Sequence, residues 1–415
     1  MKASALRFTM GSAWTNMEIL QEKTFRLLAI VWSSVWNISV KRAGMITNRR
    51  NPYSVFSTFR LTDAEVTEKN FTAIAVYSDM PQTAKFECGH PGINQLFSNA
   101  VWSMKGNFLE IPTDCPTRER TGFTGDAQVF VNTGMYLMEC YPVYRKFLSE
   151  LRAVKRDGGC VSQTAPSGKG HLFDGSAGWS DAIDLIPWRM YLRYGNQDIL
   201  KENYKKIKEW LDFSLERAKE DNPGRVRGKD DQYHSYLLDT GWHWGEWIEP
   251  DWNGFISGED PGGAYLRDIY EHGAPEVCTS HLSYGCQIAA EAAQLLGRKE
   301  EADFYSEMRR LTKLAYREAC MENGRMKQKR QCDYVHAVMF DMITDEEKKT
   351  ACDELNEMIV QNGFHLNTGF LSTCELLRVL SDYGHADTAW SLMLQDTYPS
   401  WLYQLKYHAT TIWEN

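Results

Sequence analysis

Residues 111–128, IPTDCPTRERTGFTGDAQ, gather charged side chains in a stretch whose prolines and glycines mark it as a turn-rich loop. Asp114 and Glu119 lie five residues apart, and Asp126 follows seven residues after Glu119. Two such carboxyl groups can serve as general acid and general base, and others can hold the hydroxyl groups of a polar substrate. In the alternative that stays open, the acids pair with the neighbouring arginines and cap the next helix.

A second acidic segment, GSAGWSDAIDLIPW at residues 175–188, places Asp181 and Asp184 at an expected helix start, directly behind Trp179. The flat face of a tryptophan can stack on a sugar ring. The two acids fit either a substrate contact or simple helix capping, and both interpretations stay open.

A third segment, DTGWHWGEWIEPDW at residues 239–252, surrounds Glu246 with the tryptophans Trp242, Trp244, Trp247 and Trp252. This pattern fits the wall of a carbohydrate site, with Glu246 as a substrate contact. Burial of the tryptophans in an ordinary core is the alternative.

The composition indicates a globular protein and excludes several kinds of partner. Hydrophobic residues make up 43% and aromatic residues 13% of the 415 residues, enough for a sizeable core. The formal net charge of -9 argues against nucleic acid or an anionic membrane as partner. Ten cysteines without CxxC spacing indicate reduced thiols, and no signal peptide opens the chain, so we expect a cytoplasmic protein. The chain contains no GxGxxG, P-loop, HExxH or GxSxG motif, and we expect neither a metal nor a cofactor.

From about residue 87 onward, apolar residues recur at helical spacing, beginning with residues 93–106. Gly195, Gly297 and Gly384 each end one helical pattern, and an acidic residue opens the next within a few residues. Short turns of this kind join antiparallel helices, so the sequence predicts repeated helical hairpins that form a mainly α, closed α/α barrel. Residues 1–80 hold short β-prone runs instead, which favours a partial β-sandwich or an unassigned N-terminal segment.

Carboxylates and tryptophans on the loops of a helical barrel fit glycoside hydrolysis, in which one carboxyl group protonates the leaving oxygen and another activates water or attacks. The segment DCPTRERTGFTGDAQ resembles the signature of the bacterial α-L-rhamnosidases of glycoside hydrolase family 78. Further segments agree in order, namely VYSDMPQT, NQLFSNAVWSMKGNFLEIPTDCP, SAGWSDA, HLNTGFLST, TYPSW and ATTIWE. The resemblance covers roughly residues 70–415 and implies an (α/α)6 barrel over residues 81–415, flanked by β-sandwich domains.

This resemblance implies a hydrolase that releases L-rhamnose from α-L-rhamnosides with inversion, with Glu119 as general acid and Glu414 of ATTIWE as general base. The two carboxyl groups of an inverting pair lie about 6.5–9.5 Å apart, which leaves room for the attacking water. Substrate contacts are implied at Asp114, Arg118, Asp126, Trp179, Asp181, Trp244 and His365, and the tryptophan-rich segment adds Glu246. The expected partner is an L-rhamnose-containing glycoside, and the oligomeric state stays open.

Three departures from the family pattern bear on this interpretation. Phe123 stands where the family usually has tryptophan, and His408 replaces the glycine that usually precedes ATT. The chain also stops at Asn415, directly after ATTIWE, which predicts a barrel without its last helical pair and a chain shortened at both ends. A silent rhamnoside-binding fragment, an inverting barrel glycosidase of other specificity and a purely structural scaffold are the alternatives.

Overall fold

The computed structural model describes residues 75–116, 118–168, 173–220, 222, 232–250 and 273–413, together with the backbone of six short strands before residue 75. The chain divides into two compact units. The first unit comprises Met1–Gly122 and Gln404–Asn415, and the second comprises Phe123–Tyr403.

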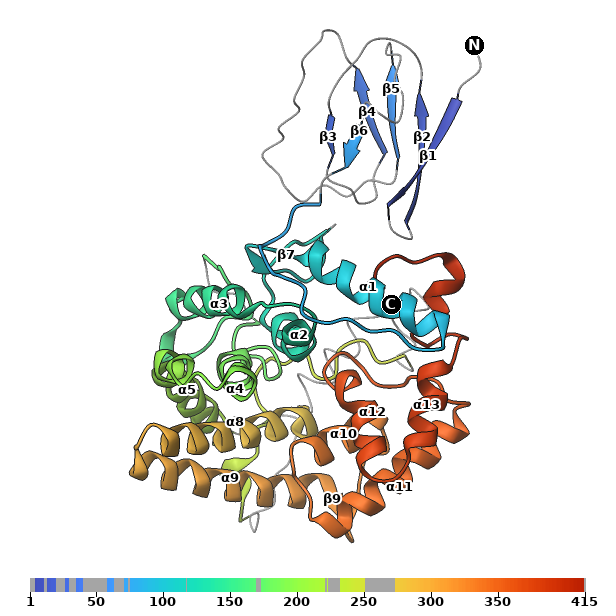
Figure 1. The fold of residues 1–415 in the computed structure, drawn as a ribbon. Helices are drawn as coiled ribbons and strands as arrows, with labels where there is room; N and C mark the ends of the chain where they lie inside the picture. The colour runs from blue at the N-terminus through green and yellow to red at the C-terminus, as the bar shows by residue number, and fades with distance from the viewer. Residues whose placement is uncertain are drawn as a thin grey trace. The chain divides into compact units, whose positions relative to one another are not determined.

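The strands before residue 75 form two small sheets (Figure 1). The larger sheet has the order β1-β2-β5-β4, with strands β1 (Ser4–Met10), β2 (Ala13–Ile19), β4 (Val35–Ser39) and β5 (Thr58–Thr62). Strands β1 and β2 pair as an antiparallel hairpin, whereas β5 runs parallel to both of its neighbours. Strands β3 (Leu27–Ala29) and β6 (Phe71–Ala73) pair in parallel.

Helix α1 (Pro91–Asn107) is the long helix of the first unit, and its start follows ordinary capping chemistry. The ring of His90 accepts a hydrogen bond from the backbone N–H of Ile93, and proline occupies the first helical position. The antiparallel strands β7 (Phe108–Leu109) and β8 (Ile111–Pro112) follow directly and lead into the acidic segment.

The second unit is built from helices in consecutive pairs (Figure 1). The pairs are α2 (Thr124–Leu137) with α3 (Tyr141–Ala153), α4 (Ala182–Tyr194) with α5 (Asp198–Arg217), α8 (Pro275–Leu295) with α9 (Lys299–Cys320), α10 (Gln331–Met339) with α11 (Asp345–Gln361), and α12 (Thr373–Asp382) with α13 (Ala386–Leu394). Short 3-10 helices lie at Asp157–Gly159 and His234–Tyr236, and strands β9 (Met321–Glu322) and β10 (Arg325–Met326) form a small hairpin. A further 3-10 helix, Tyr403–Tyr407, begins at the last residue of this unit and continues into the first unit.

The first helix of each pair belongs to an inner layer and the second to an outer layer. Helices α2, α4, α8, α10 and α12 lie against one another in that order, while α3 lies beside α5 and α11 beside α13. Burial follows the layers, because 15 of the 21 residues of α8 are buried but only 5 of the 22 residues of its partner α9. The alternation of inner and outer helices is the arrangement of an α/α barrel.

The turns between paired helices have the chemistry expected from the sequence. Gly195, Gly297 and Gly384 adopt φ values of 70°, 74° and 93°, the left-handed conformation that ends a helix without steric cost. The following helices α5, α9 and α13 each carry an acidic residue in the first turn, which complements the helix dipole. Within the described ranges, no helix combines the length and the apolar character needed to cross a bilayer.

Candidate active site

The acidic segment of the first unit forms a loop that is closed on itself, and residues 114–121 are called the carboxylate loop below. The backbone N–H of Asp114 donates to the carbonyl of Thr121 (3.1 Å), and the N–H of Thr121 donates to Oδ1 of Asp114 (2.8 Å). The thiol of Cys115 donates to Oδ2 of Asp114 (2.9 Å). Both carboxylate oxygens of Asp114 therefore brace the loop that carries Glu119.

Glu119 presents its carboxylate at the surface of this loop. Its side chain is 43% exposed, and Oε1 accepts a hydrogen bond from Arg118 at 2.9 Å. An exposed ion pair of this kind contributes about 0–1 kcal/mol, so it can open when another partner arrives. One atom each of Asp114, Cys115 and Glu119 lies within 4.8 Å of the others, a spacing that can hold a metal ion but that the thiol–carboxylate hydrogen bond already explains.

The segment that leads to Glu414 is hydrogen-bonded to helix α1 within the same unit. The amide of Asn99 donates to the carbonyl of Ala409 (2.9 Å), and the backbone N–H of Ile412 donates to Oγ of Ser103 (2.8 Å). Glu414 itself lies outside the described residues. These bonds tie the last described residues of the chain to helix α1.

His408, which stands where the family usually has glycine, adopts a φ of 58°. Glycine enters this left-handed conformation without steric cost, and histidine is one of the few other residues enriched there. The backbone conformation therefore accounts for the glycine of the family pattern and for the tolerance of histidine in this chain.

Asp126 lies in the first turn of α2 and is half-buried. Helix α2 is anchored by Thr124, whose N–H and hydroxyl both donate to the carbonyl of Gln163 (2.8 and 3.0 Å). Gly125 is required there, because a Cβ at this position would lie 2.6 Å from the indole of Trp179. Asp126 belongs to the second unit, whereas the other acids of the motif belong to the first.

Asp181 and Asp184 are core carboxyl groups; Asp181 occupies the N-cap position of helix α4, but its side chain makes no capping hydrogen bond. Oδ2 of Asp181 accepts from the N–H of Gly178 (2.6 Å) and Oδ1 accepts from the indole of Trp210 (2.8 Å). Burial raises the pKa of Asp181 to about 6. Burial and the nearby charge of Asp181 raise the pKa of Asp184 well above its ordinary value, and its oxygens have no hydrogen-bond partner among the described residues.

Six aromatic side chains of the second unit gather into one cluster, called the aromatic wall below: Phe173, Trp179, Trp242, Trp244, Trp247 and Phe370. Trp179 stacks on Phe370 with ring centroids 5.6 Å apart, and Trp244 meets Trp247 edge to face at 5.0 Å. Trp244 is half-buried, and its indole N–H donates to Oε1 of Gln163 (3.0 Å). Phe123 also packs against this wall, at the position where the family usually has tryptophan, and Trp252 lies outside the described residues.

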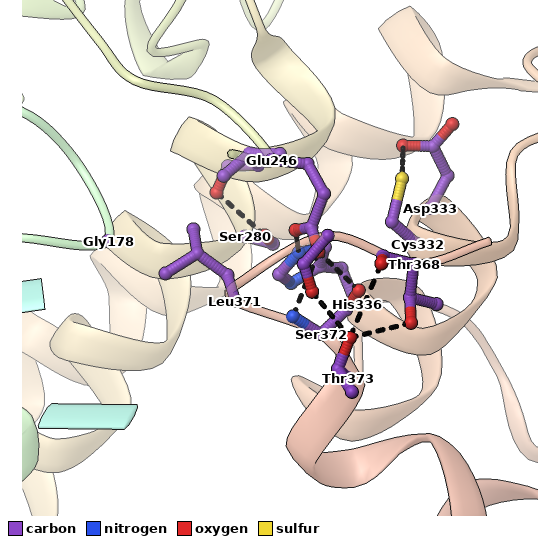
Figure 2. Close-up of polar contacts among 12 residues, drawn as sticks. Gly178, Glu246, Ser280, Cys332, Asp333, His336, Thr368, Leu371, Ser372 and Thr373 are labelled. Atoms are coloured by element: carbon purple, nitrogen blue, oxygen red, sulfur yellow. Dashed lines mark hydrogen bonds and ion pairs between the residues drawn. The ribbon is translucent and has the colours of Figure 1, made fainter. Parts of the chain in front are cut away.

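The side chains of the remaining two expected substrate contacts, His365 and Glu246, are hydrogen-bonded to other residues of the protein. His365 bonds the carbonyl of Asn362 through Nδ1 (2.8 Å) and Oγ1 of Thr397 through Nε2 (2.7 Å), and it is not among the residues of the aromatic wall. Glu246 is fully buried beside His336 and Ser372 (Figure 2). The sequence pattern gave no sign of these two partners, because they come from helix α10 and from the residue before α12.

The paired inner and outer helices define the class of α/α barrels. A family model described as the bacterial alpha-L-rhamnosidase 6 hairpin glycosidase domain matches residues 81–415. The chain belongs to this family. The resemblance seen in the sequence motifs and the predicted mainly α, six-hairpin fold are thereby confirmed.

Individual relatives support the same assignment. An alpha-L-rhamnosidase of Formosa agariphila is 33% identical over 353 residues, which cover 82% of this chain and 34% of the relative. The crystal structure of Streptomyces avermitilis alpha-L-rhamnosidase complexed with L-rhamnose is 32% identical with a TM-score of 0.69, covering 82% of this chain and 30% of that one. The Aspergillus terreus enzyme is 30% identical with a TM-score of 0.72, covering 85% and 38%. The chain thus spans about a third of the length of these relatives.

Proposed function

We propose that this chain is a glycoside hydrolase that releases terminal L-rhamnose from α-L-rhamnosides with inversion of configuration. The observation that carries the proposal is membership of the rhamnosidase domain family over residues 81–415, with the acidic motif intact at Asp114, Glu119 and Asp126. A relative of this family has been crystallised with L-rhamnose. The aromatic wall supplies the apolar faces on which a sugar can stack.

In the proposed mechanism Glu119 is the general acid. It donates a proton to the glycosidic oxygen as the bond to the aglycone breaks, and its exposed position leaves the carboxyl group accessible to a substrate. Glu414 is the general base, which removes a proton from the water that attacks the opposite face of the ring. The segment before this base is bound to helix α1, since Asn99 donates to the carbonyl of Ala409 and the N–H of Ile412 donates to Oγ of Ser103.

The other family positions receive supporting roles in the same proposal. Asp114 and Asp126 accept hydrogen bonds from ring hydroxyls, and Arg118 orients the acid. Trp179 and Trp244 provide stacking faces within the aromatic wall. Asp181 supports the wall indirectly, because its carboxylate accepts hydrogen bonds from the N–H of Gly178, the residue before Trp179, and from the indole of Trp210.

Two further assignments belong to this proposal. We place the protein in the cytoplasm, because all ten cysteines are free thiols, the state expected in a reducing compartment. Residues 1–80 are assigned to a partial β-sandwich and residues 81–415 to the barrel, in keeping with the strands before residue 75 and the helices after residue 90.

The test is release of the aryl group from a panel of aryl glycosides that includes the α-L-rhamnoside and other α-L- and β-D-glycosides. Wild-type protein should cleave the α-L-rhamnoside, and Glu119→Gln should lower the rate by at least about 100-fold, the usual scale of general acid catalysis. Glu87→Gln removes an exposed carboxylate of the same unit and should match wild type. Cleavage of a different glycoside in preference would support a barrel glycosidase of other specificity.

A further inference from the structure

The buried carboxylate of Glu246 lies at the centre of a small polar cluster formed with His336 and Ser372 (Figure 2). Oε1 of Glu246 accepts from the backbone N–H (3.0 Å) and the hydroxyl (2.5 Å) of Ser372. Oε2 of Glu246 pairs with Nε2 of His336 at 2.7 Å, and both side chains are 0% exposed. A substrate therefore cannot reach Glu246 without rearrangement of the core.

The cluster favours the charged form of Glu246. Burial alone would raise the pKa of Glu246, but the charge of His336 and the hydrogen bonds from His336 and Ser372 lower it below its ordinary value. The neighbouring ring of His281 lies 5.5 Å from that of His336, and burial together with His336 lowers the pKa of His281 to about 3. The carboxylate of Glu246 accepts hydrogen bonds from the N–H and hydroxyl of Ser372 and from His336, which hold it in place. Loss of one of these partners would leave a buried charge without full compensation and would destabilise the fold.

Glu246 also lies within the chain segment that carries three residues of the aromatic wall, Trp242, Trp244 and Trp247. Residues 240–249, called the tryptophan loop below, place Trp244 and Trp247 on either side of it. Ile248 adopts a φ of 61°, a strained conformation for a β-branched residue that persists only where surrounding contacts impose it. The cluster and the strained residue are adjacent, so the cluster is placed to supply those contacts.

The segment before helix α12, residues 369–372, is in direct contact with the tryptophan loop. The N–H of Phe370 donates to the carbonyl of Trp247 (2.7 Å). Gly369 permits this approach, since a Cβ there would lie 2.5 Å from that carbonyl oxygen and 2.8 Å from Cγ of Glu246. Phe370 in turn stacks on Trp179. Residues 369–372 therefore connect the cluster with Trp179 as well as with Trp247 of the aromatic wall.

The far end of the tryptophan loop has its own anchor. Nδ1 of His243 accepts from the N–H of Ala177 (2.9 Å), which places the proton on Nε2, the donor to the carbonyl of Thr240 (2.8 Å). Burial and the charge of Arg217 lower the pKa of His243 to about 3, so this anchor stays neutral. The two anchors differ in kind, and only the one at Glu246 is built on a carboxylate.

We propose that Glu246, His336 and Ser372 are positioning residues that hold the tryptophan loop, and hence the aromatic wall, in the geometry that binds the sugar. The inference rests on the proposed function for its sugar and on the structure alone for its effect on the wall. Because the wall stacks on the sugar and takes no part in bond breaking, its displacement weakens ground state and transition state alike and raises KM rather than lowering kcat.

The experiment compares Glu246→Gln and Ser372→Ala with the control Glu347→Gln. Glu347 is also an ion-paired carboxylate of the second unit, held by Arg317 (2.7 Å) on the outer helices α9 and α11. Near-UV circular dichroism reports on the tryptophans without substrate, and KM and kcat are measured with an aryl α-L-rhamnoside. We expect altered near-UV spectra and a KM raised by at least about tenfold in both cluster variants, with kcat nearly unchanged and the control like wild type.

The outcomes separate the two proposals. Near-UV spectra and KM that match the control in folded Glu246→Gln and Ser372→Ala would overturn the positioning role. If Glu246→Gln does not fold, Ser372→Ala carries the test, since it removes only the hydroxyl donor and keeps the backbone one. If wild-type protein cleaves no rhamnoside, the proposed function fails, while the spectra of the variants still decide whether the cluster positions the wall.

Discussion

Replacement of Gly125 by alanine tests whether helix α2 and the aromatic wall pack as closely as the structure indicates. Gly125 is the second residue of α2, and a methyl group built on it lies 2.6 Å from Cε2 and Nε1 of Trp179 and 2.7 Å from Cδ1. Carbon atoms pack at about 3.5–4.0 Å, so the indole must retreat by roughly 1 Å. Trp179 is 4% exposed and stacks on Phe370, so its retreat displaces the wall.

Two opposing effects decide the change in stability. Alanine in place of glycine within a helix stabilises the fold by roughly 0.5–1 kcal/mol, because the unfolded chain loses conformational freedom. Insertion of a methyl group into a well-packed core costs roughly 1–3 kcal/mol. The second effect is larger, so we expect Gly125→Ala to lower the free energy of unfolding by about 1–2 kcal/mol.

The assay is urea unfolding followed by tryptophan fluorescence, with near-UV circular dichroism of the folded proteins. We expect Gly125→Ala to alter the near-UV spectrum, and we expect a Trp179→Phe background to recover part of the lost stability, since the smaller ring leaves room for the methyl group. An alanine variant at least as stable as wild type, with an unchanged spectrum, would show that the packing inferred around Trp179 is incorrect.

Three other substitutions give independent checks. The stability that Asp181 contributes is present below its ordinary pKa of 3.8 and is lost as the pH rises through its raised pKa of about 6. The advantage of wild type over Asp181→Asn in urea unfolding should therefore shrink by roughly 2 kcal/mol between pH 4 and 6.5. Gly178→Ala should unfold at markedly lower temperature than wild type in calorimetry, because Gly178 has a φ of 80° and a Cβ there would lie 2.6 Å from Leu371. Thr344→Ala removes the capping box of α11 and should cost about 1 kcal/mol in urea unfolding without changing KM.

The sequence allowed the helical layers to be predicted because their signals are local. A glycine with left-handed φ at Gly195 or Gly384 and an acid in the following turn lie within a few residues of each other, and helix ends depend on such neighbours. The carboxylate loop was located for the same reason, since its acids, prolines and glycines are contiguous. Its internal bracing by Asp114 follows from residues at most seven positions apart.

The surroundings of single acids could not be predicted, because they are set by residues far away in the chain. Glu246 was expected to contact substrate from its tryptophan neighbours, but its burial depends on His336 and Ser372, which lie 90 and 126 positions away. Asp181 was open to a capping role, and its partner Trp210 comes from the next helix. Burial of a charged group requires partners, and no local pattern identifies them.

The most direct test of the central claim is proton NMR of the 415-residue chain during incubation with an aryl α-L-rhamnoside, recorded early enough to identify the first anomer formed. We expect β-L-rhamnose to appear first and to convert slowly to the equilibrium mixture, and we expect Glu119→Gln to release sugar at least about 100-fold more slowly than wild type. First appearance of the α-anomer would contradict the inverting mechanism, and sugar release by Glu119→Gln at the wild-type rate would contradict the assignment of the general acid.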